Sequence, residues 1–234
     1  MKITKYSQST FIVENNLGQR LLIDPGKYNY ENGFTPKDFG KIDILVVTHK
    51  HEDHHDINAE KEIINLWKPQ VITCHEIGNR EEPKNLGYQI KNVGDKVESN
   101  GFAITFISAD HFAKCELIVN FGLFIQADNV SFYHTSDTRF METCYFDYEL
   151  VKNANVLAVP ISNRGVVMGL DDSIVFTSQI EPNFVIPMHY DSPKDKGRIN
   201  ANDFVNRFNE LTSKISNLSK TKVQVLNFNE SINL

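Results

Sequence analysis

Cysteine is scarce in this sequence: only three occur among 234 residues, at Cys74, Cys115 and Cys144. An odd and sparse set of cysteines does not build the disulfide framework on which small secreted domains depend. We therefore expect reduced thiols and a cytoplasmic location. None of the three lies in the histidine-rich pattern described below, so cysteine is not expected to bind a metal.

Long apolar runs and broad basic segments are also missing. No apolar run is long enough to cross a bilayer, and residues 1–5 lack the apolar core of a signal peptide, so we expect no membrane partner. The formal net charge of −6 argues against nucleic acid as a partner bound through a broad basic face. With 41% hydrophobic residues and no linker or low-complexity segment, the chain predicts one globular domain, 1–234.

Histidine, in contrast, is concentrated: four of the eight histidines lie within positions 49–55. The segment 48–56 follows an apolar run, 42–47, which predicts a buried strand. Residues 57–67 predict a helix with Asp56 as its N-cap. The polar segment should therefore lie between a strand end and a helix start, where open α/β sheets bind their ligands.

The spacing within this segment suits metal binding. If the backbone stays extended, His49 and His51 point to the same side and can share one ion. Asp53 and His54 follow where the chain turns into the helix, and they could hold a second ion nearby. Such nitrogen and oxygen donors suit zinc, manganese or iron. The alternative is a solvated polar loop that is rich in histidine by chance.

Short strands and helices alternate along the rest of the chain. Strands are predicted at 2–5, 11–13, 20–23, 71–73, 91–93, 96–97, 102–107, 117–126, 130–134, 156–159, 185–187 and 223–225. Further helices are predicted at 171–180, capped by Asp171 or Asp172, and at 201–218. Residues 27–40 are expected to form a loop. Composition and periodicity alone indicate an α/β or α+β domain.

The pattern His49-x-His51-x-Asp53-His54 resembles the HxHxDH signature of the metallo-β-lactamase superfamily. Four dispersed matches follow the family's order and extend the resemblance over nearly the whole chain: Asp24, His111, Asp137 and His189. The surroundings of the last two are similar to the branch of small metal-dependent hydrolases that includes ascorbate-6-phosphate lactonase. The resemblance implies a four-layer αββα sandwich.

The resemblance also implies a site and a chemistry. Two divalent ions (Zn, Mn or Fe) would cleave a small ester, lactone or phosphodiester with an activated water, and Asp53 and Asp137 would be the catalytic carboxylates. The implied first ligand set is His49, His51 and His111; the second is Asp53, His54 and His189; Asp137 bridges them. Asp24 would hold a ligand imidazole by a hydrogen bond, which is compatible with its also forming the turn before Pro25.

Two positions depart from the family pattern. Gln8 stands where many relatives carry histidine; because glutamine cannot be protonated, the role left open to it is a neutral hydrogen bond to substrate. Ser136 stands where relatives often carry glycine before the bridging carboxylate. An anionic substrate would be held by Arg139 or Arg164, because a guanidinium suits phosphate or carboxylate. Tyr190, next to His189, is a further candidate contact to substrate.

Two other classes of function remain open at this point. One is a nuclease of the same superfamily, which the acidic balance and the lack of an evident RNA-binding arm disfavour. The other is a metal-binding or sensing domain without turnover, which the complete set of ligand types disfavours. A homo-oligomer is left open as well.

Overall fold

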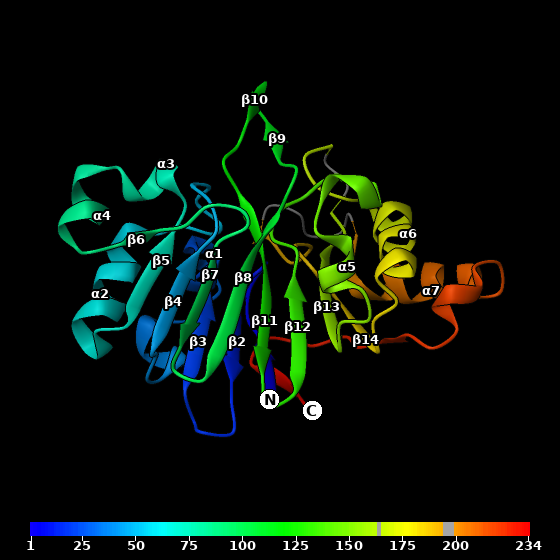
Figure 1. Ribbon diagram of the computed structural model, residues 1–234, viewed down its shortest axis with the longest axis horizontal. Coiled ribbons are helices and arrows are strands. Elements are labelled where there is room, and N and C mark those ends of the chain that lie inside the picture. The colour runs from blue at the N-terminus through cyan, green and yellow to red at the C-terminus, as the bar shows by residue number, and fades with distance from the viewer. Residues whose placement is uncertain (163–164, 194–198) are drawn as a thin grey trace.

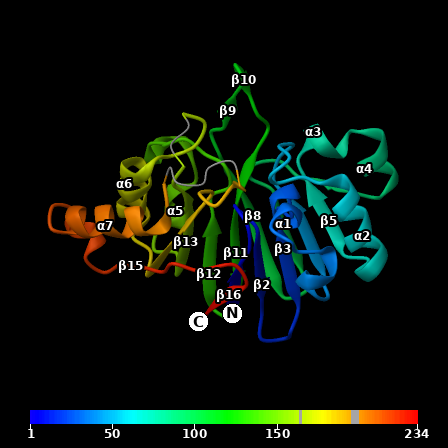
Figure 2. The same ribbon diagram turned by 180° about the vertical axis from the view of Figure 1, so that it is seen from behind.

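The computed structural model describes residues 1–162, 165–193 and 199–234. Two seven-stranded sheets face each other, with helices on both outer sides, so the chain forms the expected four-layer αββα sandwich (Figures 1 and 2). The first sheet has the order β16-β1-β2-β3-β4-β5-β6 and the second β15-β14-β13-β12-β11-β8-β7.

The first sheet contains strands from both ends of the chain. Its members are β1 (Lys2–Lys5), β2 (Phe11–Glu14), β3 (Arg20–Ile23), β4 (Ile44–Val47), β5 (Gln70–Thr73), β6 (Gln89–Ile90) and β16 (Glu230–Asn233). The helical segments that cover it are α1 (Lys27–Glu31), η1 (Pro36–Phe39), α2 (Ile57–Trp67), α3 (His75–Gly78) and α4 (Glu81–Asn85). All four residues of β4 are buried, because the strand is covered on both faces.

The second sheet is built from the later part of the chain. Its members are β7 (Lys96–Ser99), β8 (Phe102–Ser108), β11 (Phe121–Ala127), β12 (Val130–His134), β13 (Val156–Pro160), β14 (Phe184–Met188) and β15 (Lys222–Val223). On its outer side lie η2 (Thr143–Tyr145), α5 (Tyr148–Val151), α6 (Leu170–Ile180), α7 (Ala201–Thr212) and η4 (Ser216–Leu218). A separate hairpin, β9 (Phe112–Ala113) and β10 (Glu116–Leu117), projects beyond one edge of the sandwich (Figure 1).

Aromatic side chains fill the space between the sheets. Phe11 of the first sheet packs against Phe132 of the second, with ring centroids 5.6 Å apart. Phe106 and Phe121 meet edge to face at 4.8 Å within the same core. A second cluster, which includes the fully buried Phe176 and Phe204, joins α6 and α7 to the second sheet. Because these cores fix both sheets, loops that leave the same edge are held at defined distances from each other.

Most predicted elements are confirmed, with boundary shifts of a few residues. Helix 57–67 and strand 130–134 have the predicted limits, whereas the predicted strand 117–126 is divided into β10 and β11. The predicted strand 91–93 is wrong: β6 ends at Ile90, and residues 91–93 lead into a turn in which Asp95 accepts from the Asn92 amide. The predicted strand 223–225 is present in part as β15, which ends at Val223, and it is not the final strand, because β16 follows it.

Three predictions about where helices occur, begin or end need correction. Residues 27–40 are not a plain loop, because they contain α1 and η1. Helix α6 begins at Leu170 with Gly169 at the N-cap, so neither Asp171 nor Asp172 is the capping residue. Helix α7 ends at Thr212 instead of continuing to 218, in a serine- and threonine-rich segment whose side chains compete for backbone hydrogen bonds.

The strand ends that concern function meet at one edge. Strands β3, β4 and β5 are mutually parallel, as are β12, β13 and β14. Strand β8 runs in the same direction as β12, because each pairs antiparallel with β11. The chain therefore leaves β4, β8, β12 and β14 toward the same edge, and the residues that follow are the candidate ligands.

Among the described residues, no helix combines the length and apolar character needed to cross a membrane.

Asp56 provides a test of how the polar segment is fixed to α2. Its side chain accepts hydrogen bonds from the amides of Asn58 and Ala59. We expect Asp56→Ala to lower the free energy of unfolding by about 1 kcal/mol, because two amides lose their acceptor. Urea denaturation of the metal-free protein measures this change. Asp56→Ser should retain most of the stability, and equal stability of the alanine variant would contradict the capping role.

Candidate metal centre

The segment between β4 and α2 brings four candidate side chains together. His49 and His51 point to the same side, as predicted, with His49 Nε2 3.2 Å from His51 Nδ1. His54 is fully buried, and Asp53 retains a side-chain exposure of 17%. The amides of His54 and His55 both bond to the carbonyl of His51, which produces the turn that redirects Asp53 and His54.

The other three candidates reach this segment from the second sheet. His111 follows β8, Asp137 follows β12 and His189 follows β14. The first group of donor atoms belongs to His49, His51, His111 and Asp137, and all lie within 4.8 Å of one another. His111 Nε2 is 3.0 Å from His51 Nδ1 and 3.7 Å from Asp137 Oδ2.

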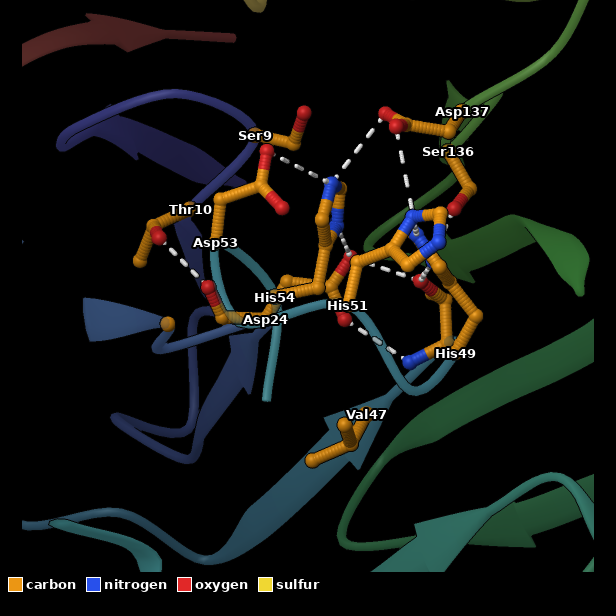
Figure 3. Close-up of polar contacts among 12 residues, drawn as sticks. Ser9, Thr10, Asp24, Val47, His49, His51, Asp53, His54, Ser136 and Asp137 are labelled. Atoms are coloured by element: carbon orange, nitrogen blue, oxygen red, sulfur yellow. Dashed lines mark hydrogen bonds and ion pairs between the residues drawn. The ribbon is translucent and has the colours of Figure 1, made fainter. Parts of the chain in front are cut away.

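A second group adjoins the first and shares Asp137 with it. It consists of Asp53, His54, Asp137 and His189, whose donor atoms also lie within 4.8 Å of one another. The Asp137 carboxylate approaches His54 Nε2 at 3.1 Å and His189 Nε2 at 3.2 Å. Figure 3 shows the His54 ring between the carboxylates of Asp53 and Asp137. The seven residues of the sequence pattern thus form two four-donor groups with one common carboxylate.

These groups have the donor chemistry of a metal site. Nε2 of His54, Nε2 of His189 and Oδ1 of Asp137 are buried and, among the described residues, none makes a hydrogen bond of acceptable geometry. His54 and His189 are within ion-pair distance of Asp137, but buried polar atoms that make no hydrogen bond are costly in a folded protein. Imidazole and carboxylate together suit divalent transition metals. The donors therefore fit such an ion in either group.

The outward-facing nitrogens of the imidazoles are fixed by hydrogen bonds. His54 Nδ1 donates to Asp24 Oδ2 at 2.7 Å, and His111 Nδ1 donates to the Val166 carbonyl at 2.9 Å. His189 Nδ1 lies 3.1 Å from Ser162 Oγ. Contacts of this kind set the tautomer and ring orientation of metal-binding histidines. Asp24 has the position and the bond that the family resemblance implied for it.

Strained backbone accompanies these side chains. Gln8, Asp24, Ser136 and His189 all have positive φ, between 49° and 58°, although none is glycine. Such conformations cost about 1–3 kcal/mol each for non-glycine residues and cluster at functional sites. Ser136, directly before Asp137, therefore adopts a conformation that glycine usually supplies.

The histidines of the two donor groups differ in how readily they are protonated. Burial lowers the pKa of His49 well below its usual value, and burial together with neighbouring His111 also lowers that of His51. Burial acts against protonation of His189 too, but the Asp137 and Asp53 carboxylates raise its pKa to about 10. Burial opposes ionisation of Asp137, yet His189 and His54 hold its pKa well below the ordinary range.

An open cavity of about 630 Å³ leads to the centre. It is lined by Tyr28, Lys50, His51, Glu52, Asp53, Ala113, Lys114 and Val166. Lys50 binds Glu76 at 2.5 Å and Glu116 at 2.8 Å, and so fixes the projecting hairpin to the histidine-rich segment. A small substrate can therefore approach between this segment and the hairpin.

The residues suggested for substrate binding occupy different positions. Gln8 is buried beside the centre, where its carbonyl accepts from the His189 amide at 3.3 Å. The Tyr190 ring lies 5.2 Å from Lys5 Nζ. Arg139 is committed to a two-pronged ion pair with Asp110, with contacts of 2.9 and 3.1 Å. Arg164 lies outside the described residues.

Two supporting residues were not identified from the sequence. Glu60 is fully buried on α2; its carboxylate binds His55 Nδ1 at 2.7 Å and accepts from the Tyr88 hydroxyl at 2.6 Å. Gly26 lies so close to the histidine-rich segment that a Cβ atom there would fall 2.0 Å from the Asp53 carbonyl. A glutamate at a core-facing helix position was an available signal for Glu60, whereas no local pattern marks Gly26.

Comparison with known proteins places this arrangement in a family. The model of the β-lactamase superfamily domain matches residues 2–189, and the chain belongs to this family. A relative described as a metal-dependent hydrolase from Methanosarcina mazei is 30% identical over 200 residues, which cover 82% of this chain and 84% of the relative. A relative of the same description from Methanocaldococcus jannaschii is 30% identical, over 89% of this chain and 93% of its own.

Solved structures agree with the fold. Igni18, described as a metallo hydrolase from Ignicoccus hospitalis, has a TM-score of 0.78 and 25% identity over 99% of this chain and 97% of its own. The metallo-β-lactamase fold protein YhfI from Bacillus subtilis has a TM-score of 0.76 at 13% identity, over 99% of this chain and 98% of its own. This second likeness concerns the fold alone.

The raised pKa of His189 predicts proton release on metal binding. At pH 8 the imidazole, with a pKa of about 10, is protonated in the metal-free protein. A metal-binding imidazole must be neutral, so metal uptake should expel this proton and weaken as the pH falls. Calorimetric titration in two buffers of different ionisation enthalpy should show about one proton or more released per chain. His189→Gln should release fewer, and a binding enthalpy that does not depend on the buffer would contradict the prediction.

Proposed function

We propose that this protein is a metal-dependent hydrolase that uses two divalent cations to cleave a small ester, lactone or phosphodiester. The observation that carries the proposal is the pair of four-donor groups that share Asp137 and open into a cavity. The descriptions of the relatives from M. mazei and M. jannaschii, and of Igni18, support a hydrolase. Lactones are included in the proposal because the sequence resembles the branch that contains ascorbate-6-phosphate lactonase.

The ligand assignment follows the two groups. His49, His51 and His111 would hold one cation, Asp53, His54 and His189 would hold the other, and Asp137, which belongs to both donor groups, would serve both. The donors suit Zn, Mn and Fe, which ligand type alone does not rank. When bound, a pair of such cations supplies Lewis acidity and makes water nucleophilic near neutral pH.

The side chains of this chain have complementary roles in that chemistry. Asp137 is 2% exposed, so its charge would act on bound cations with little screening by solvent. Asp53 lines the cavity and is partly exposed, which places a carboxylate where it can orient an attacking water. The Asp24 carboxylate holds His54, and the Val166 carbonyl holds His111, so both rings keep their orientation during turnover.

The contacts of Arg139 bear on the charge of the substrate. Arg139, proposed as an anion-binding residue, is paired with Asp110, and its guanidinium also lies 5.4 Å from the Phe112 ring centroid. An anionic substrate would have to compete with that carboxylate. We therefore propose small esters and lactones ahead of phosphodiesters.

Metal content and turnover test the proposal together. Protein purified without chelators and reconstituted with zinc, manganese or ferrous iron should bind about two ions per chain by elemental analysis. It should hydrolyse at least one member of a panel of lactones, aryl esters and bis-p-nitrophenyl phosphate, and metal-stripped protein should not. Less than half an ion per chain would refute the dinuclear centre. Two bound ions without turnover of any member would favour a sensing role, and cleavage of single-stranded RNA alone would favour a nuclease.

Asp137→Asn tests the bridge separately. An amide neither balances two cations nor bridges them as well as a carboxylate does, so both ions should bind more weakly, by about tenfold or more, and turnover should fall. Inductively coupled plasma analysis after dialysis measures retention. Asp172→Asn, on the exposed start of α6, is the matched control and should retain both ions. Full retention and full rate in Asp137→Asn would show that the bridging role is wrong.

A further inference from the structure

Two buried hydroxyl groups connect the loops that carry the ligands. Thr48 directly precedes His49, Ser136 directly precedes Asp137, and both are fully buried. Ser136 Oγ donates to Thr48 Oγ1 at 2.8 Å, and Thr48 Oγ1 donates to Asp24 Oδ2 at 2.8 Å. Thr48 follows β4 of the first sheet and Ser136 follows β12 of the second, so this contact joins the two sheets beside the candidate ligands.

The direction of each hydrogen bond follows from the Asp24 carboxylate. A carboxylate only accepts, so the Thr48 proton points to Asp24 and the Thr48 oxygen accepts from its other neighbours. These neighbours are Ser136 Oγ and His49 Nδ1, the latter at 3.1 Å. The proton of His49 therefore lies on Nδ1, which leaves the Nε2 lone pair facing the first group of donors.

Asp24 extends the connection to the second group. Its Oδ2 atom accepts from both Thr48 Oγ1 and His54 Nδ1, and its Oδ1 atom accepts from the Thr48 amide at 2.7 Å. A single buried carboxylate thus contacts a ligand of one group directly and a ligand of the other through Thr48. Displacement of the Thr48 hydroxyl would therefore disturb His49 in the first group and, through Asp24, His54 in the second.

The backbone at Ser136 shows what the serine side chain contributes. Its φ of +57° is a conformation that glycine adopts without strain. The hydroxyl has one proton for two acceptors, Thr48 Oγ1 and Asn120 Oδ1 at 2.9 Å. Asn120 in turn donates to the Asp137 carbonyl at 2.5 Å. Since glycine would suit the turn better, the feature that serine adds at this position is the hydroxyl group.

We propose that the hydroxyls of Ser136 and Thr48 are positioning groups that hold Asp137 and His49 in ligand geometry, so that the affinity of both metal sites depends on them. The inference rests on the dinuclear centre of the proposed function, but not on any substrate. We name this connection, from Ser136 through Thr48 to Asp24, the hydroxyl relay.

Substitutions that remove one hydroxyl at a time test the relay. Ser136→Gly should leave the stability of the metal-free protein close to that of wild type, because relief of the positive φ offsets the lost hydrogen bonds, yet it should bind zinc about tenfold more weakly. Thr48→Val should also weaken both sites, and Thr48→Ser should restore them. In the double variant the losses should be less than additive, because both hydroxyls act through the same contact. Competition titration with a chromophoric chelator gives the affinities, and the visible spectrum of bound Co²⁺ reports ligand geometry.

A matched control separates the hydroxyl from the backbone effect. Asn153 is exposed, has a φ of +60° and lies outside both donor groups, so Asn153→Gly relieves similar strain and should leave zinc affinity unchanged. If Ser136→Gly binds zinc within about twofold of wild type while wild type takes up two ions, the relay is wrong and the dinuclear centre stands. If wild type takes up no metal, both are refuted.

Discussion

The buried carboxylate of Asp137 is the feature on which the centre depends. Four imidazole nitrogens surround it, from His54 at 3.1 Å, His189 at 3.2 Å, His111 at 3.7 Å and His49 at 3.9 Å. A charge taken out of water destabilises the fold unless opposite charge and hydrogen bonds surround it. In the metal-free protein the raised pKa of His54 and His189 provides that charge. The site therefore carries its own cations, which arriving metal ions would replace.

Such an arrangement requires that loops from two separate sheets meet with little freedom. Strand β4 delivers His49 from the first sheet, while β12 and β14 deliver Asp137 and His189 from the second. The sheets are held by aromatic packing, as between Phe11 and Phe132, and by Phe11 against the His134 ring at 5.4 Å. His134 Nε2 also bonds to the Ser9 carbonyl at 2.9 Å, next to the strained turn at Gln8. His134 thus contacts both the aromatic core and the polar residues beside the centre.

Comparison of the predictions with the structure, residue by residue, shows which contacts can be predicted from neighbours in the sequence. The spacing of His49 and His51, and the capping by Asp56, depend on neighbours in sequence, and the structure has both arrangements. The meeting of His111 with His51 depends on how two sheets pack, and only the family resemblance anticipated it. Contacts such as Glu60 with His55 and Tyr88 were not anticipated, because one polar residue on an amphipathic helix carries no mark of its distant partner. The same reason applies to Arg139, whose partner Asp110 lies 29 positions away.

Strain at the centre has a consequence for how stability is distributed. Asp24, Ser136 and His189 keep positive φ, so the turns that hold the ligands are each less stable than a relaxed turn by about 1–3 kcal/mol. Hydrogen bonds at two of these residues oppose this cost: Asp24 accepts from Thr48 and His54, and Ser136 donates to Thr48. Each such bond contributes a net stabilisation of about 0.5–1.5 kcal/mol, or more when one partner is charged. The two effects are of similar size, so the geometry persists only while the polar contacts are complete. A ligand set held this way resists relaxation when the ions leave, because the turns share their hydrogen bonds and cannot relax one at a time.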